Sequence, residues 1–307
     1  AQAIGAILSL IRPYLTQDCE ITLEANPQSA EIAKFDEYYQ VGINRLSIGV
    51  QSFDEVALKT IGRLHDASQA RSAIVAAQQV GFTRINVDLM YGLPGQTEAA
   101  ALRDLKTVFD YGIQHLSWYQ LTLEPNTRFA ACPPKLPAEE EVATIEQSGR
   151  AFISEHDLHR YEVSAYARSN HAARHNLNYW RFGDYLGLGA GAYSKLTVGQ
   201  QIWRWYRQKR PEDYMMERPL IQHKKSQVSG AELVYEFMLN ACRLMEGFSL
   251  SLFQSRTGLS SSVLTTGLRR AEALGLLSVV GPLVSPTSLG REFVNETVQL
   301  FAPSGTK

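Results

Sequence analysis

The sequence is poor in net charge, in cysteine and in long apolar runs, and each shortage excludes a class of protein. Its 307 residues carry a formal net charge of −1 at pH 7, so it has no basic field of the kind that attracts nucleic acid, and no nucleic-acid partner is expected. No stretch reaches the roughly 18 consecutive apolar residues of a membrane-spanning helix. The first residues lack an initiator methionine and the basic and apolar segments of a secretory signal peptide. We therefore expect a globular chain that begins inside a helix, as a fragment or a processed product.

Cysteine is too sparse to organise the chain. Cys19, Cys132 and Cys242 are far apart in the sequence, which excludes a disulfide framework and the usual spacing of metal ligands. Each is expected to be a small buried apolar residue. A chain without disulfides fits a reducing compartment, so a cytoplasmic location is expected.

What the sequence does have is a regular alternation of strand and helix patterns in its first half. Four runs rich in apolar and β-branched residues predict strands at residues 20–27, 42–53, 84–92 and 115–123. The amphipathic runs between them predict helices. This alternation is typical of βαβ units around a parallel sheet, either open or closed into a barrel.

These predicted strands carry more polar residues than parallel strands covered on both faces normally do. The polar residues stand at or near the C-terminal end of each strand: Glu24 and Asn26, Gln51 and Ser52, Asp88, and Gln120 and Thr122. One such residue could be a solvated loop group. Four strands that share the feature predict a site, because the C-terminal ends of barrel strands meet at one rim. Glu24 would need a partner if buried, and Arg45 and Arg63 are the available cations.

The second half of the chain has a different pattern. Helical runs over 231–245, 250–257 and 261–274 precede short strands around Gly281-Pro282, an order that resembles a winged-helix module. With so little net charge, we expect this module to pack or to cover a substrate, not to bind DNA. Residues 203–207 interleave tryptophan, tyrosine and arginine. That pattern also occurs in nucleic-acid-binding proteins, but the low charge favours a partly buried amphipathic helix.

Five motifs together resemble the oxygen-independent coproporphyrinogen III oxidase group of radical S-adenosylmethionine proteins. They are ITLEANP (21–27), GINRLSIGVQSF (42–53), IGRLHD (61–66), INVDLMYGLPGQT (85–97) and HNLNYW (175–180). The resemblance covers the whole chain, and RHNLNYW is most similar to the heme chaperone branch of the group. It implies an α/β fold, a partial (β/α)6 TIM-type barrel whose first two strands are missing here, with a smaller C-terminal winged-helix-like α/β domain. The domains would be residues 1–200 and 201–307.

The resemblance also implies a [4Fe–4S] cluster and S-adenosylmethionine as cofactors. In the family, a CxxxCxxC loop before the region covered here holds the cluster, and a glycine-rich turn meets the methionine part of S-adenosylmethionine. This sequence contains neither, and its three cysteines cannot substitute by spacing. We expect truncation and not loss of the chemistry, because the rest of the cofactor rim is present.

Several residues can be carried over to the cofactor rim by motif position. By resemblance, Glu24 is the carboxylate that contacts S-adenosylmethionine, and Gln51, Arg63 and Asp88 match a set that surrounds a second S-adenosylmethionine in the oxidase branch. Thr122 and Tyr193 match positions that approach the adenosine side. The glycines of GLGAGA (187–192) would either let backbone approach a ligand or form a tight turn.

The HNLNYW motif has two interpretations, a structural histidine or a heme-binding site. Read from the residues alone, it is a histidine in an aromatic cluster. By resemblance it binds heme, with His175 as an iron ligand, Asn176 fixing the ring tautomer, and Tyr179 and Trp180 offering flat apolar surface. His156, His159 and His171 could compete as ligands, whereas His65 and His115 are expected to be structural.

Three functions remain open on the sequence. The first is a heme chaperone that binds heme or porphyrin, receives it from bacterioferritin-like donors and passes it to respiratory hemoproteins, with peripheral membrane association. The second is oxidative decarboxylation of coproporphyrinogen III by a 5′-deoxyadenosyl radical. The third is a truncated scaffold with neither activity.

Overall fold

The computed structural model describes residues 1–216 and 224–303, and the chain divides into two compact units. Unit 1 comprises residues 1–160 and 164–172, and unit 2 comprises residues 161–163 and everything from 173 onward. The division predicted after residue 200 falls instead inside a β-hairpin of unit 2, whose two strands are hydrogen-bonded to each other. Within the described ranges, no helix combines the length and the apolar character needed to cross a bilayer.

Unit 1 is built on a six-stranded mixed sheet in the order β1-β2-β3-β4-β6-β5. Its first four strands are parallel: β1 (Thr22–Ala25), β2 (Arg45–Gln51), β3 (Ile85–Tyr91) and β4 (His115–Gln120). β6 (Ala165–Ala167) is antiparallel to β4, and β5 (His159–Arg160) is antiparallel to β6. The predicted α/β class and its four parallel strands are therefore confirmed, whereas the antiparallel edge was not predicted.

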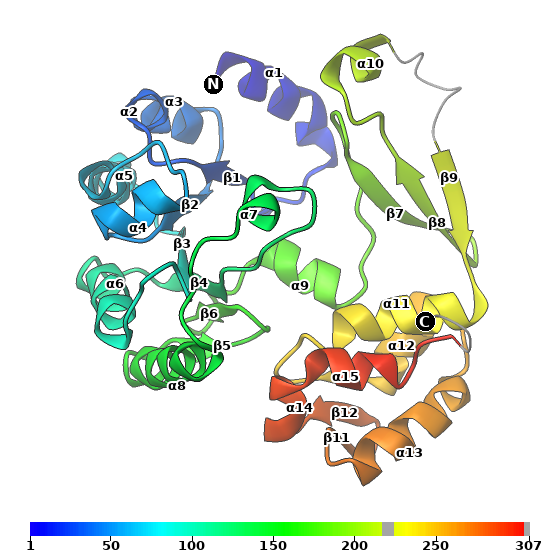
Figure 1. Cartoon of the computed structure of the whole chain (residues 1–307). Helices are drawn as coiled ribbons and strands as arrows, with labels where there is room; N and C mark the ends of the chain where they lie inside the picture. Colours follow the sequence, from blue (N-terminus) through cyan, green and yellow to red (C-terminus); the bar gives the residue numbers. More distant parts are fainter. Residues whose placement is uncertain (217–223, 304–307) are drawn as a thin grey trace. The chain divides into compact units, whose positions relative to one another are not determined.

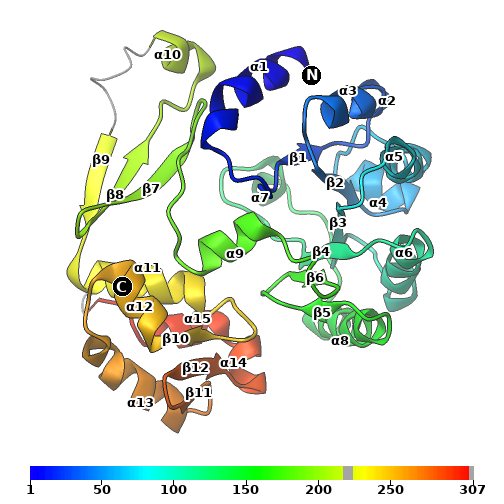
Figure 2. The ribbon, with the colours of Figure 1, turned by 180° about the vertical axis from the view of Figure 1, so that it is seen from behind.

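The helices of unit 1 are α1 (Gln2–Ile11), η1 (Arg12–Tyr14), α2 (Ser29–Ile32), α3 (Phe35–Gln40), α4 (Glu55–Thr60), α5 (Ala67–Val80), α6 (Glu98–Asp110), α7 (Arg128–Ala131) and α8 (Glu139–Glu155). Of these, α2 to α6 and α8 cover one face of the sheet, whereas α7 lies on the other side (Figures 1 and 2). The boundaries of α5 follow from local chemistry, since Asp66 and Gln69 form a capping box and Gly81 ends the helix with φ = +107°.

The two faces of the parallel sheet differ in polarity. Leu46, Ile48 and Val50 of β2 and Val87 and Leu89 of β3 are completely buried in the core beneath the helices. Side chains alternate between faces along a strand, so the residues between these lie on the opposite face: Thr22 and Glu24, Arg45 and Ser47, Asn86 and Asp88, and His115, Ser117 and Tyr119. The polar residues therefore line this face along the length of the strands. From the sequence we expected them only at or near the C-terminal strand ends.

β2 ends in a turn that is stabilised by hydrogen bonds to a side chain of helix α6. Gln51 has φ = +71°, and the pairing of β2 with β3 shifts register between Ile48 and Gln51. Just beyond, the Ser52 hydroxyl donates to Asp104 Oδ2 (2.6 Å) and the Phe53 amide donates to Asp104 Oδ1 (2.8 Å). Because left-handed backbone is unfavourable for a residue with a side chain, the buried Asp104 of α6 holds the turn that Gln51 needs.

Unit 2 begins with α9 (Arg174–Trp180) and a three-stranded antiparallel sheet. The sheet has the order β7 (Tyr193–Val198), β8 (Gln201–Tyr206), β9 (Lys224–Val228), and α10 (Pro211–Met216) follows β8. The prediction of an amphipathic helix through Trp203, Trp205 and Tyr206 is therefore wrong. Arg204 and Ile202 alternate with the tryptophans at a period of two, which is the strand pattern, and Gly199 (φ = +63°) makes the hairpin turn.

The rest of unit 2 follows the predicted order of helices and a hairpin. The elements are α11 (Gly230–Ala241), α12 (Leu250–Thr257), η2 (Ser261–Leu264), α13 (Thr265–Ala273), α14 (Ser288–Glu292) and α15 (Val294–Gln299), with the sheet β10 (Phe248–Ser249), β12 (Leu283–Pro286), β11 (Leu277–Val280). Phe237, which is completely buried, packs edge-on against Phe182, Phe248 and Phe253 at the centre of its core.

Asp104 predicts a specific pH dependence of stability. Burial raises the pKa of its carboxyl from 3.8 to about 6, against the hydrogen bonds from Ser52 and Phe53. The folded state therefore holds this proton more tightly than the unfolded state. The contribution of the protonated Asp104 carboxyl to the free energy of unfolding is fully present below about pH 4 and is lost as the pH rises through about 6. In Asp104→Asn this loss, about 3 kcal/mol, should disappear.

Urea unfolding at several pH values between 4 and 7 measures the effect. Asp110→Asn is the matched control, because Asp110 lies on the same helix but is exposed and paired with Lys106. Parallel pH profiles for the wild type and Asp104→Asn would contradict this account of Asp104.

Candidate functional site

The centre of the polar face is the side-chain amide of Asn86, which is buried on β3. Its nitrogen donates to Ser47 Oγ and to Asp88 Oδ1, both at 2.7 Å. Its oxygen accepts from Ser117 Oγ (3.1 Å) and lies 2.6 Å from His115 Nδ1, which must therefore carry a proton. An amide has two donors and two acceptor sites, so Asn86 is fully satisfied and links β2, β3 and β4.

Asp88 stands one step further along the same face. Burial raises the pKa of its carboxyl, hydrogen bonds from Asn86 and Ser117 oppose the rise, and the negative charge of Glu24 adds to it. Arg45 lowers the same pKa through its positive charge. Glu24 itself is exposed at the end of β1. The two carboxylates therefore repel each other, which favours a cationic group placed between them.

Gln51 and Tyr119 complete the rim. The Tyr119 hydroxyl donates to Gln51 Oε1 at 2.8 Å. Burial and the Asp88 charge raise the pKa of Tyr119 to about 12, while Arg63 lowers it. The structure thus brings four predicted residues to one place, because Glu24, Gln51 and Arg63 each interact with the pair formed by Asp88 and Tyr119. The left-handed turn at Gln51 serves to aim its amide at this pair.

Arg45, which was expected as a possible counter-charge for Glu24, lies beside another carboxylate. Arg45 is 2% exposed and lies 4.0 Å from the carboxylate of Glu20, which is also 3.0 Å from Arg84. The ion-pair partner of Arg45 is therefore Glu20. Sequence reasoning missed Glu20, Ser47, Asn86, Ser117 and Tyr119. The period-two alternation along each strand carried the signal for the last four, because it places them on the same face as Glu24 and Asp88.

Thr122 and Tyr193 have other surroundings. Thr122 lies two residues beyond the end of β4, is exposed, and donates to Glu124 Oε1 at 3.1 Å. Tyr193 belongs to unit 2, on β7, where it is 48% exposed and packs edge-on against Tyr206. Their expected approach to the adenosine of S-adenosylmethionine stays a prediction.

The HNLNYW motif forms the short helix α9. His175 is half-buried, and Tyr179 lies one turn further along on the same side, 39% exposed and edge-on to Tyr185 at 4.8 Å. The Asn176 amide nitrogen donates to the Tyr161 hydroxyl at 3.0 Å. Asn176 therefore anchors the helix to Tyr161. From the sequence we expected it to fix the ring tautomer of His175 instead.

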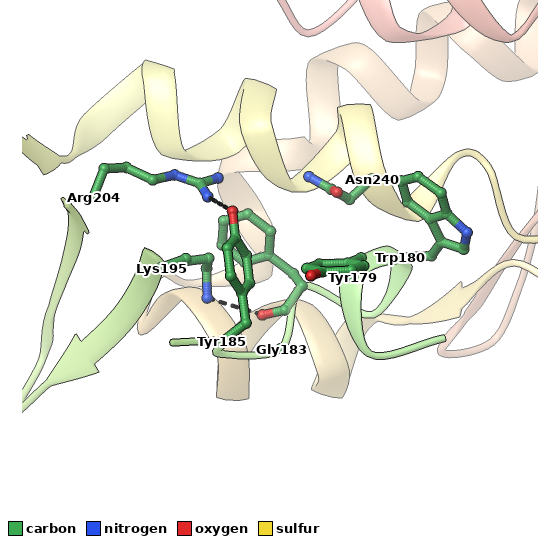
Figure 3. A pocket seen from close by; sticks show the side chains of 8 residues that line it. Tyr179, Trp180, Gly183, Tyr185, Lys195, Arg204 and Asn240 are labelled. Carbon is green, nitrogen blue, oxygen red and sulfur yellow. Dashed lines mark hydrogen bonds between the residues drawn. The ribbon is translucent and has the colours of Figure 1, made fainter. Parts of the chain in front are cut away.

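A small pocket of about 150 Å³ opens beside the end of α9, lined by Tyr179, Trp180, Phe182, Gly183, Tyr185, Lys195, Arg204 and Asn240 (Figure 3). Its cations are already neutralised. Lys195 donates to Asp184 (2.8 Å) and to the Phe182 carbonyl (3.0 Å), while Arg204 donates to Glu236 (3.2 Å) and to the Tyr185 hydroxyl (2.6 Å). The pocket is smaller than the roughly 300 Å³ at which ligand sites begin, so a porphyrin would have to lie against the exposed side of α9.

The other candidate iron ligands have different surroundings. The His156 ring stacks on Phe109 and bonds the Phe152 carbonyl, and the exposed His159 faces Asp157 at 3.4 Å. Burial, together with Arg84 and Arg168, lowers the pKa of His171. All three belong to unit 1, whereas His175 belongs to unit 2. His65 and His115 are buried and bonded to the Val50 carbonyl and to Asn86 respectively.

The described residues offer no site for an iron–sulfur cluster. Over residues 1–216 and 224–303, no three histidine, cysteine or acidic side chains are grouped to hold a metal ion. Cys242 is buried and Cys19 partly so, but Cys132 is exposed, so the expectation of burial was wrong for Cys132.

Comparison with known proteins places the chain in a family. The Radical SAM superfamily model matches residues 3–108, and the HemN C-terminal domain model matches residues 228–293. The "Heme chaperone HemW" of Haemophilus influenzae is 39% identical over 98% of this chain and 79% of the relative. The protein of the same name from Escherichia coli is 40% identical over 94% of this chain and 76% of the relative.

A solved structure supports the same placement at the level of the fold. The coproporphyrinogen III oxidase HemN of Escherichia coli, described as a radical SAM enzyme, superposes with a TM-score of 0.78 at 22% identity, over 97% of this chain and 73% of that one. The chain therefore belongs to the radical S-adenosylmethionine superfamily, in the HemN-like group that includes the HemW proteins.

Proposed function

We propose that this protein is a heme chaperone, which binds heme at α9 and delivers it to hemoproteins. The observation that carries the proposal is the identity of about 40% to proteins named heme chaperone, over nearly the whole chain. The geometry of α9 supports it, since a half-buried His175 and a partly exposed Tyr179 stand one turn apart on one side of the helix. Respiratory hemoproteins as acceptors and bacterioferritin-like proteins as donors are part of the proposal, as are a cytoplasmic location and peripheral contact with a membrane.

In this proposal each residue of the motif has a separate task. A ring nitrogen of His175 binds the heme iron. The Tyr179 ring offers a flat apolar surface against the porphyrin. Asn176 holds α9 in place through Tyr161, to which the backbone amide of Ala173 also donates (3.4 Å).

The polar rim of unit 1 fits S-adenosylmethionine. Glu24 and Asp88 can accept from its ammonium group and offset its sulfonium charge, and Gln51 can bond its polar edges. On the same face, the buried Thr22 hydroxyl has no hydrogen-bond partner among the described residues, so it is available to a ligand. In radical SAM proteins this cofactor, together with a [4Fe–4S] cluster, supplies the 5′-deoxyadenosyl radical. The described residues do not fit such a cluster, and the roles given to the residues of this chain do not involve it.

A coproporphyrinogen III oxidase is the second candidate, because Gln51, Arg63 and Asp88 gather at the rim as the oxidase branch would require. Anaerobic conversion of coproporphyrinogen III to protoporphyrinogen under reducing conditions would support it over the chaperone.

Replacing His175 should weaken heme binding. His175→Ala removes the proposed iron ligand, so heme affinity should fall at least about tenfold, or about 1.4 kcal/mol. Titration with heme, followed by the position of the Soret band, measures this. His159→Ala is the matched control, because His159 is an exposed histidine outside the motif. Equal affinity and an unchanged Soret band in His175→Ala would contradict the assignment of the ligand.

Replacing Glu24 should change both the cofactor affinity and Asp88. Glu24→Gln removes a charge that raises the pKa of Asp88, so that pKa should fall. The affinity for S-adenosylmethionine should drop about threefold to tenfold.

Carbon-13 NMR of the side-chain carboxyl and calorimetry measure the two effects. Glu37→Gln, an exposed change on α3, should alter neither. An unmoved Asp88 titration in Glu24→Gln would show that the two carboxylates do not share a site.

A further inference from the structure

Trp180 is the residue of the HNLNYW motif whose ring nitrogen has no task in the proposed function. Its ring lines the small pocket beside α9 together with Tyr179. The indole nitrogen is buried and has no hydrogen-bond partner among the described residues. In Figure 3 this nitrogen lies on the side of the ring that faces away from Tyr179 and Lys195. An indole N–H can only donate, so a buried one without an acceptor is a donor available to a ligand.

An arginine side chain lies over the same ring. The guanidinium carbon of Arg243 is 4.5 Å from the centroid of the Trp180 ring. Arg243 follows the end of α11 and comes three residues, or about one turn, after Asn240, which also lines the pocket. Both α9 and α11 belong to unit 2. Stacking on an aromatic ring holds the plane of a guanidinium, while its N–H groups point outward in that plane.

The guanidinium of Arg243 has no acidic partner within the described part of the chain. Its Nε is buried and has no hydrogen-bond partner. The terminal nitrogens also form no hydrogen bond or ion pair with a described residue, but they are not buried, so an anion can reach them. Lys195 and Arg204 differ, since they are paired with Asp184 and Glu236. A half-buried charge without a partner is costly, and a bound anion would remove that cost.

The arrangement of donors favours a carboxylate. The planar fork of an arginine binds the two oxygens of a carboxylate through parallel hydrogen bonds, and the Trp180 N–H lies next to this fork. In the proposed function a porphyrin lies against α9 beside Tyr179, the neighbour of Trp180 in the helix. Heme carries two carboxylates on side chains at the edge of its ring. The charged group that Arg243 lacks is therefore present on the proposed ligand.

We propose that Arg243 and Trp180 bind one carboxylate of the heme at α9, with Arg243 as the charged partner and the Trp180 N–H as a further donor. This inference rests on the proposed function and adds the residues that recognise the acid side chain of the ligand. It gives Trp180 a role in hydrogen bonding besides the apolar surface expected from the sequence. The bound heme then contacts both α9 and the end of α11.

Heme dimethyl ester, in which both carboxylates are blocked, tests this inference by comparison with heme. The full chain should bind heme at least about tenfold more tightly than the ester, because only the free acid forms charged hydrogen bonds. In Arg243→Gln this preference should fall at least about fivefold. Trp180→Phe keeps an aromatic ring but removes the donor, so the preference should fall about threefold. Titrations followed by the Soret band measure each affinity.

Two further variants act as controls. Arg269→Gln is the matched control, since it removes an exposed arginine from α13 of the same unit, and it should keep the full preference. Arg243→Lys keeps the charge but loses the planar fork, so its preference should lie between those of the wild type and Arg243→Gln. His175→Ala should weaken the binding of heme and of the ester alike, which separates the iron ligand from the carboxylate site.

The outcomes separate this inference from the proposed function. If heme and the ester bind the wild type equally, or if Arg243→Gln keeps the full preference with an unchanged melting temperature, the inference is overturned and the proposed function stands. Should Arg243→Gln not fold, a full preference in both Arg243→Lys and Trp180→Phe overturns it in the same way. If the wild type binds neither compound, the proposed function fails, and this inference fails with it.

Discussion

The hydrogen bonding of one buried amide sets the character of unit 1. A parallel sheet normally buries apolar side chains on both faces, but here one face carries Asn86, whose four hydrogen-bonding positions are filled from its own strand and the two neighbouring strands. An unmade bond at a buried amide would cost about 1–3 kcal/mol. The network therefore fixes the positions of Ser47, Asp88 and Ser117, and it allows a polar surface to exist beside a well-packed core.

The rim depends on support from the opposite, helical face. Asp104 of α6 binds Ser52 and Phe53, and this stabilises the left-handed turn at Gln51. Gln51 can then accept from Tyr119 on the polar face. A carboxylate among the helices thereby positions an amide at the candidate cofactor site.

Much of this architecture could be predicted from the sequence, and the failures have physical causes. The four parallel strands and the rim residues Glu24, Gln51, Arg63 and Asp88 follow from apolar runs, motif positions and the common direction of the strands. The role of Asn86 could not be foreseen, because its partners depend on the register between strands. The pairing of Arg45 with Glu20 depends on a loop contact before β1. Residues 203–207 differ from the expected helix because low net charge carries no information about secondary structure, whereas their period-two alternation is the strand pattern. Asp104 was hidden because its partners lie about 50 residues away in sequence.

The central claim is that the polar face of the parallel sheet is one small-molecule surface. Chemical-shift mapping of the isotope-labelled protein during titration with S-adenosylmethionine tests it most directly. The account predicts that the largest saturable changes occur together at the amides of Glu24, Gln51, Asp88 and Tyr119, with little change along the outer helices α5 and α6. Changes that are absent from these four positions, or that saturate with different affinities at each of them, would contradict it.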